Sequence, residues 1–235
     1  MSGRPQRPLA VLIATLALAA PTLAAPARAR VARIPAMQEL VVLLRAHPAR
    51  FAASVHSRQL VLVPALTPIT EGQTVLPVLA RRGIWLKVRL PGRPNGRSGW
   101  IDRVATKRAF TSWRIVVDRA HRRVIVYRSG RQVRSFAAVV GKPSTPTPSG
   151  EFFVEESIAL RPGDVGAPFA LALSARSNVL QEFEGGPGQI ALHGLDNVGG
   201  VPGTAVSHGC IRLPGSAMRW LVARIAPGTP VTISG

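Results

Sequence analysis

The chain has 235 residues, enough for one large or two small domains, and 46% of them are hydrophobic, which excludes wholesale disorder. The formal net charge of +19 excludes an acidic protein. Cys210 is the only cysteine, so no disulfide can form within the chain.

Residues 1–29 have the pattern of a secretory signal peptide. Two arginines precede an apolar run from Leu9 to Ala20, and small residues lead to an Ala-x-Ala ending at Ala29. The apolar run is shorter than the about 20 residues that a membrane-spanning helix needs. We therefore expect an exported protein of the cell envelope, in the periplasm or cell wall, that meets the membrane only transiently through this segment. An uncleaved anchor is the alternative.

Residues 30–110 are predicted to be a linker followed by a small β domain. Apolar residues recur at helical spacing over 36–46, which predicts a short helix within a linker at 30–57. Over 58–110, short alternating apolar runs are separated by Gly- and Pro-rich turns, as in a small all-β barrel. The order Trp85-Leu-Lys-Val, polar loop, Gly99-Trp-Ile resembles bacterial Src-homology-3-like domains. That resemblance implies binding to cell-wall components, with a structural spacer as the alternative.

Residues 112–235 are predicted to be mainly β with a short helix. Three strands are expected between Trp113 and Val140, then a rigid proline-rich loop over 142–150 and a short strand at 151–154. After Leu213, an amphipathic helix and a last strand at 231–233 follow. The acidic residues of this part are expected on a solvated strand face. They are Glu151, Glu155 and Glu156.

Cys210 lies in the run Ser207-His-Gly-Cys-Ile-Arg212, downstream of the pair His193-Gly194. In an exported protein a lone cysteine is inert and buried, paired between chains, or free and reactive. The polar neighbours favour a reactive thiol, because nearby positive charge favours the thiolate. Gly209 has no Cβ, which allows a substrate to approach the thiol closely. Spacing alone does not say whether His193 or His208 is the base.

Three blocks together resemble the catalytic domain of bacterial L,D-transpeptidases. They are Gly141-Lys-Pro with Thr145-Pro-Thr-Pro-Ser-Gly150, then His193-Gly194, then Ser207-His-Gly-Cys-Ile-Arg-Leu213. The resemblance covers about 113–233 and implies a β-sandwich with a short helix after the nucleophile. It also implies a cysteine acyltransferase that acts on peptidoglycan stem peptides in cell-wall biosynthesis and so supports cell shape.

The resemblance further implies a role for each matched residue. Cys210 attacks the third stem residue, expels the terminal D-alanine and holds a thioester, which an amine of a neighbouring stem then captures. His193 is the general base, oriented by the backbone carbonyl of Gly194. Ser207, His208 and Gly209 frame the nucleophile, with the N–H groups of Gly209 and Cys210 as oxyanion donors. Arg212 matches a family residue suited to meeting a substrate carboxylate, and Gly194 is counted with it among the substrate-binding residues. Apart from the resemblance, Lys142 and Thr147 are expected along the substrate groove, with a plain rigid loop as the alternative.

Other interpretations remain open at this point. Water could capture the same thioester, which would make the protein an L,D-carboxypeptidase, or the thiol could be vestigial in a wall-binding protein. A zinc site of His193, His208 and Cys210 is a further alternative, although we expect no metal or cofactor. His47, His56 and His121 are expected to be surface or linker residues.

The positive charge is uneven. Residues 61–141 carry 16 Lys and Arg against 3 Asp and Glu, whereas residues 142–235 carry 6 against 7. A basic surface attracts polyanions, but an aromatic content of 5% leaves few stacking platforms for nucleic acid. We therefore expect no nucleic-acid partner. The basic N-terminal half either binds anionic wall polymers or is an ordinary solvated surface.

Overall fold

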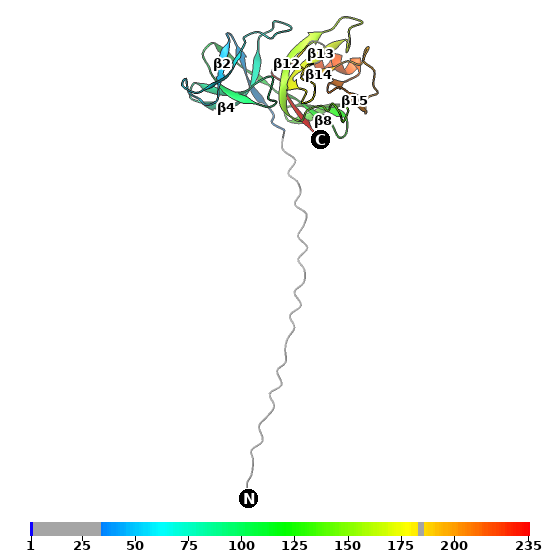
Figure 1. Cartoon of the computed structure of the whole chain (residues 1–235), viewed down its shortest axis with the longest axis horizontal. Coiled ribbons are helices and arrows are strands. Elements are labelled where there is room, and N and C mark those ends of the chain that lie inside the picture. The colour runs from blue at the N-terminus through cyan, green and yellow to red at the C-terminus, as the bar shows by residue number, and fades with distance from the viewer. Residues whose placement is uncertain (2–33, 183–185) are drawn as a thin grey trace. The chain divides into compact units, whose positions relative to one another are not determined.

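The computed structural model describes Met1 and residues 34–182 and 186–235 (Figure 1). Apart from Met1, the predicted signal peptide lies outside these residues. In the described part the chain is mainly β, as predicted, with a short helix α1 (Gly215–Val222). No helix among the described residues has the length and apolar character that crossing a membrane requires.

The N-terminal sheet domain, residues 38–111, is an antiparallel seven-stranded sheet. Its order is β3-β2-β6-β5-β4-β1-β7. The strands are β1 (Gln38–Leu43), β2 (His47–Arg50), β3 (Gln59–Val63), β4 (Val75–Arg82), β5 (Trp85–Arg89), β6 (Ser98–Asp102) and β7 (Thr106–Thr111). Inward-facing residues such as Leu43, Leu76 and Val88 form its core.

The prediction of a helix within a linker is wrong. Gln38–Leu43 form strand β1, which lies between β4 and β7. A short apolar run fits helix and strand periodicities equally, and here pairing on both sides decides for the strand. His47, expected at the surface, is fully buried on β2, whereas His56 and His121 are exposed as predicted.

The C-terminal sheet has the order β10-β9-β8-β17-β12-β13-β14-β16. Its strands are β8 (Trp113–Asp118), β9 (Arg123–Arg128), β10 (Arg131–Ala137), β12 (Gly150–Ala159), β13 (Phe169–Arg176), β14 (Gln189–His193), β16 (Ile211–Arg212) and β17 (Pro230–Ser234). A separate parallel pair joins β11 (Val140–Gly141) to β15 (Ala205–Ser207). The predicted meander β8–β10, the helix and the last strand are confirmed. Buried residues of α1, including Met218 and Leu221, pack into the core of this sheet.

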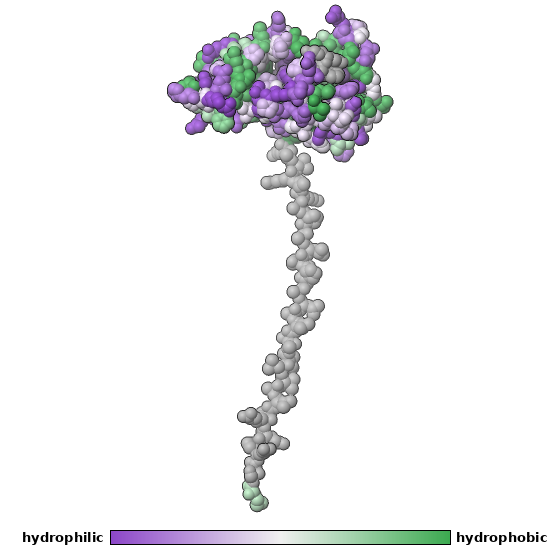
Figure 2. Space-filling model, in the orientation of Figure 1, coloured by the Kyte–Doolittle hydropathy of each residue, from purple (hydrophilic) through white to green (hydrophobic). Residues whose placement is uncertain are grey.

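Strand β12 contributes to both cores. Phe152 packs into the core of the C-terminal sheet and Phe153 into that of the N-terminal sheet domain, because successive strand residues point to opposite faces. The predicted solvated acidic face is therefore wrong for Glu155 and Glu156, which are 8% and 1% exposed. Glu151 is exposed. On the face drawn in Figure 2, hydrophilic residues predominate, with apolar residues scattered among them.

Candidate active site

Strand pairing brings the candidate nucleophile and base together. Cys210 immediately precedes β16, which runs parallel to β14, and the register places His193 beside Arg212. The half-buried Cys210 directs its Sγ to the backbone carbonyl of Gln189 at 3.9 Å. Two segments about 20 residues apart in sequence thus meet at the edge of one sheet.

Cys210, His193, His208 and Arg212 line the same cleft, which has a volume of about 800 Å³. This volume lies within the range of roughly 300–1,000 Å³ typical of sites for small ligands. His208 is exposed there, whereas His193 is half-buried. The structure therefore exposes the thiol to a site that a peptide segment can enter.

The turn that carries the thiol is closed by a serine hydroxyl. The buried Ser207 donates its hydroxyl to the Cys210 carbonyl at 2.6 Å, and its Oγ accepts the backbone N–H of Gly209 at 3.1 Å. Gly209 has a φ of +123°, which favours glycine. The Gly209 N–H is thus committed to Ser207, which contradicts its expected place as an oxyanion donor.

The proline-rich loop braces this turn. Thr147 donates its hydroxyl to the Gly209 carbonyl at 2.8 Å and accepts the Gly141 N–H at 2.9 Å. The backbone N–H of Lys142 donates to the Ser207 carbonyl at 3.0 Å. Thr147 is fully buried, and neither it nor Lys142 is among the residues that line the cleft. The structure therefore gives Thr147 a bracing position, not the expected place in a substrate groove.

The ring of His193 is held by a backbone carbonyl. Its Nδ1 lies 2.8 Å from the carbonyl oxygen of Gly194, the contact that the resemblance implied. Because a carbonyl only accepts, Nδ1 carries the proton and Nε2 has the free lone pair. Burial lowers the pKa of His193, the hydrogen bond to Gly194 opposes this shift, and the positive charge of Arg212 adds to it. The lowered pKa favours the neutral ring that a general base requires.

Two glycines, Gly194 and Gly166, leave the space in which the backbone and the His193 ring pack closely. A Cβ on Gly194 would lie 1.7 Å from the Ala167 carbonyl oxygen. A Cβ on Gly166, where φ is +82°, would lie 2.5 Å from Nδ1 of His193. Sequence reasoning missed Gly166, because only the fold brings its loop against the imidazole.

Arg212 is engaged with the protein itself. Its Nη1 donates to the backbone carbonyls of Val198 at 2.9 Å and Gly199 at 3.2 Å, while its buried Nε has no hydrogen-bond partner. The guanidinium thus fixes the turn at 198–199 at the cleft. Among the described residues, no group of three or more His, Cys, Asp or Glu side chains is placed to hold a metal ion.

A buried polar network lies next to the thiol and was also missed. Glu155 pairs with Arg176 at 3.4 Å and accepts a hydrogen bond from the Gln189 amide at 3.0 Å. Burial raises the pKa of Glu155, and Arg176 opposes that shift. Because the carbonyl of Gln189 faces Sγ of Cys210, the network positions the strand beside the thiol. The available sequence signal was the two-residue spacing of Glu155 from Phe153, which places both on the same face of a strand.

Comparisons with known proteins agree on the family. The model of the YkuD family, described as the L,D-transpeptidase catalytic domain, matches residues 112–233. YkuD of Bacillus licheniformis, assigned to the L,D-transpeptidases, is 31% identical over 125 residues, which are 52% of this chain and 66% of that protein. L,D-transpeptidase 1 of Mycobacterium tuberculosis is 29% identical over 47% of this chain and 45% of its own length.

The chain thus spans less than two thirds of either curated relative. A solved catalytic domain of an E. faecium L,D-transpeptidase is 26% identical over 52% of this chain and 95% of its own, with a TM-score of 0.39. The family model covers more than half of the chain, including Cys210 and His193. The chain therefore belongs to the YkuD family, which is defined by the L,D-transpeptidase catalytic domain.

Proposed function

We propose that the protein is a peptidoglycan L,D-transpeptidase in which Cys210 is the nucleophile and His193 is the general base. The observation that carries this proposal is the cleft that both residues line, with Nδ1 of His193 anchored on Gly194. That anchor leaves Nε2 to accept a proton. Family membership supports the reaction class.

The reaction consists of two acyl transfers. His193 removes the thiol proton, Sγ of Cys210 attacks the carbonyl of the third stem residue, and a C–S bond forms. The C–N bond to the terminal D-alanine then breaks, and the leaving amine takes the proton from His193. In the second half, a side-chain amine of another stem attacks the thioester and gives a proton to His193. A new C–N bond forms, the C–S bond breaks and the thiol is restored.

The neighbouring residues support this chemistry by position. The hydroxyl of Ser207 fixes the turn that presents Sγ, and Thr147 fixes that turn from behind. His208 and Arg212 line the cleft, and we propose that they contact the stem peptide. A partly engaged arginine still has donors for a substrate carboxylate.

Export and wall binding belong to the same proposal. A signal segment at 1–29 would deliver the enzyme to the envelope, where its substrate is found. The small β domain at 38–111 would act as a Src-homology-3-like module and bind wall components. The excess of basic residues in 61–141 supports attraction to anionic wall polymers.

Product analysis tests the reaction. Purified protein is incubated with disaccharide-tetrapeptides, and the products are separated by liquid chromatography and identified by mass. We expect cross-linked dimers and free D-alanine from the wild type and neither from Cys210→Ser. Shortened stems without dimers would instead identify an L,D-carboxypeptidase. Binding to cell wall without any product would indicate a non-catalytic wall-binding protein.

A further inference from the structure

A loop of the N-terminal sheet domain reaches the cleft that holds the thiol. Pro68 and Ile69 line the same cleft as Cys210 and His193. The side chain of Ile69 is 54% exposed, so an apolar group from one sheet domain faces a site whose reactive groups belong to the other. No local sequence pattern connects Ile69 with Cys210, which lie about 140 residues apart in the chain.

A buried carboxylate fixes this loop. Oε2 of Glu156 accepts the backbone N–H of Thr70 at 2.7 Å, the hydroxyl of Thr70 at 2.8 Å and the backbone N–H of Ile69 at 3.3 Å. Glu156 is 1% exposed and comes from β12 of the C-terminal sheet. Hydrogen bonds to a charged acceptor are stronger than neutral ones. The backbone beneath Ile69 is therefore held in place before any ligand arrives.

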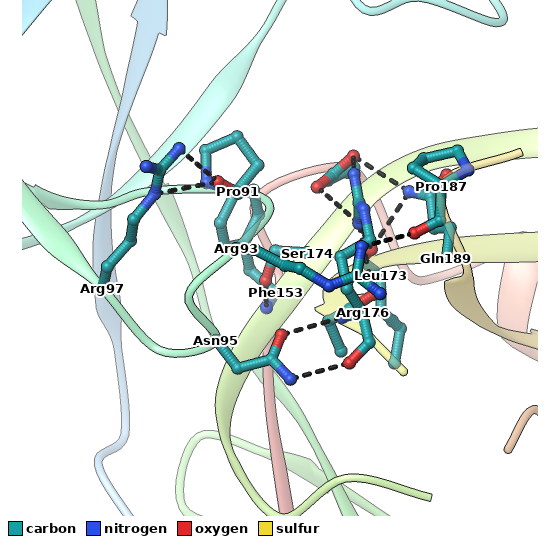
Figure 3. A network of polar contacts seen from close by, with 12 residues as sticks. Pro91, Arg93, Asn95, Arg97, Phe153, Leu173, Ser174, Arg176, Pro187 and Gln189 are labelled. Atoms are coloured by element: carbon teal, nitrogen blue, oxygen red, sulfur yellow. Dashed lines mark hydrogen bonds and ion pairs between the residues drawn. The ribbon is translucent and has the colours of Figure 1, made fainter. Parts of the chain in front are cut away.

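A second loop, residues 90–97 between β5 and β6, attaches the same domain beside the cleft. Asn95 both donates to and accepts from the backbone of Arg176, at 2.7 and 2.8 Å (Figure 3). Arg93 donates to three backbone carbonyls, those of Ser177, Leu180 and Pro187, at 2.8 to 3.0 Å. These three residues and Arg176 line the cleft. The N-terminal sheet domain thus meets the cleft at two places: it lines the cleft at Pro68 and Ile69, and it holds cleft residues through Arg93 and Asn95.

On the basis of the proposed function, we propose that the N-terminal sheet domain supplies a wall of the substrate cleft and that Ile69 contacts the stem peptide. The matching chemistry is aliphatic: alanine methyl groups and the carbon chain of the diamino acid. Leu160, Val165 and Leu180 line the same cleft and extend the apolar surface. An apolar side chain on a fixed backbone binds with little loss of entropy. Glu156 is a positioning residue, since it acts through Ile69.

The test measures binding separately from catalysis. The Kd of a disaccharide-tetrapeptide is measured by calorimetry on the full chain carrying Cys210→Ala, with and without Ile69→Ala. The matched control is Ile84→Ala, because Ile84 belongs to the same domain, is 50% exposed and does not line the cleft. We expect Ile69→Ala to weaken binding about fivefold, which corresponds to roughly 1 kcal/mol of lost apolar contact. Ile84→Ala should leave Kd unchanged.

An unchanged Kd for Ile69→Ala, or an equal change for Ile84→Ala, overturns the inference, as does a cleft that does not bind the tetrapeptide at all. These outcomes differ from failure of the proposed function, in which the tetrapeptide binds but the wild type makes no product. In the active enzyme, Ile69→Ala should raise KM and leave kcat unchanged, because Ile69 does not touch the reacting atoms.

Separate variants test whether Glu156 positions the loop that carries Ile69. Thr70→Val removes the hydroxyl that bonds Glu156 and keeps the backbone N–H, so we expect a smaller rise in Kd, about twofold. Thr70→Ser keeps a hydroxyl and should restore the wild-type Kd. Equal values for Thr70→Val and Thr70→Ser, with both folded by circular dichroism, would contradict a positioning role for the Glu156 contact.

Discussion

The two sheet domains divide the work at the cleft unequally. The C-terminal sheet presents the thiol, the imidazole and Arg212 on adjacent strands, and residues 142–235 are nearly neutral in charge. The N-terminal sheet domain supplies apolar lining at Pro68 and Ile69 and backbone support through Arg93 and Asn95. The comparison teaches that the C-terminal part supplies the reactive groups and most of the cleft lining, and that the N-terminal sheet domain adds one edge of the cleft and support from outside. Substitutions at the contacts from the N-terminal sheet domain should therefore affect binding but not kcat.

The largest effect is expected at Gly194, in the catalytic region. A Cβ there would lie 1.7 Å from the Ala167 carbonyl oxygen, so Gly194→Ala should destabilise the protein by more than about 3 kcal/mol. Gly163→Ala is the control, since its Cβ would meet nothing within 4 Å and only its positive φ of +97° is strained. It should lose about 1 kcal/mol. Urea unfolding measures both, and equal losses would contradict the close packing around His193.

Thr147→Val tests the brace behind the nucleophile turn. The substitution removes the hydrogen bonds to Gly209 and Gly141 and leaves buried backbone groups unpaired, for about 2 kcal/mol of lost stability. We expect a lower kcat with little change in KM. The control is Thr232→Val, which removes an exposed hydrogen bond to Glu151. It should change the free energy of unfolding by no more than about 0.5 kcal/mol and leave kcat and KM unchanged. A normal kcat in folded Thr147→Val would show that the brace is not needed.

Arg93→Ala tests the support from the N-terminal sheet domain. The loss of three hydrogen bonds to cleft carbonyls should reduce the free energy of unfolding by about 1–2 kcal/mol and raise KM. The control is Arg97→Ala, because the guanidinium of Arg97 donates to the Pro91 carbonyl within its own loop. If both variants raise KM equally, the division between the two domains is not supported.

The smallest effect is a shift in pH dependence. His193 must be neutral to act as a base, and its pKa is lowered from the ordinary 6.5 by burial and by Arg212. The acid limb of kcat/KM should therefore have its midpoint below pH 6.5. Arg212→Gln removes a positive charge, so the pKa of His193 should rise and the limb should move to higher pH, by less than about one unit. A shift to lower pH would contradict this electrostatic account.

Local sequence patterns predicted strands β8 to β10, the start of β12, the helix α1 and the last strand β17, but not β13 to β16. They worked where alternation and turn residues are local, whereas the pairing of Cys210 with His193 came from the resemblance of three separated blocks to one family. They failed at Gln38–Leu43, where an ambiguous apolar run became a strand through pairing on both sides. They also failed at Glu155, which is buried against Arg176 and Gln189, and at Glu156, which is buried against the loop of the N-terminal sheet domain at Thr70.

The surroundings of Cys210 and His193 could not be predicted, because they depend on contacts between residues that are distant in the sequence. Gly166 packs against the His193 ring, and Ser207 binds the Gly209 N–H that was expected to serve the oxyanion. Arg93 and Asn95 were visible only as part of a turn between strands. Their hydrogen bonds to cleft residues join two domains, and residues so far apart in the sequence show no local pattern that predicts such contacts.

The most direct test of the central claim is to trap the acyl-enzyme. Wild-type protein is mixed with disaccharide-tetrapeptide, quenched with acid within the first turnover, and analysed by intact mass and peptide mapping. We predict a mass increase equal to the disaccharide-tripeptide acyl group, on the peptide that contains Cys210, and no increase in Cys210→Ala. Release of D-alanine with an unmodified Cys210, or an adduct on another residue, would contradict the account.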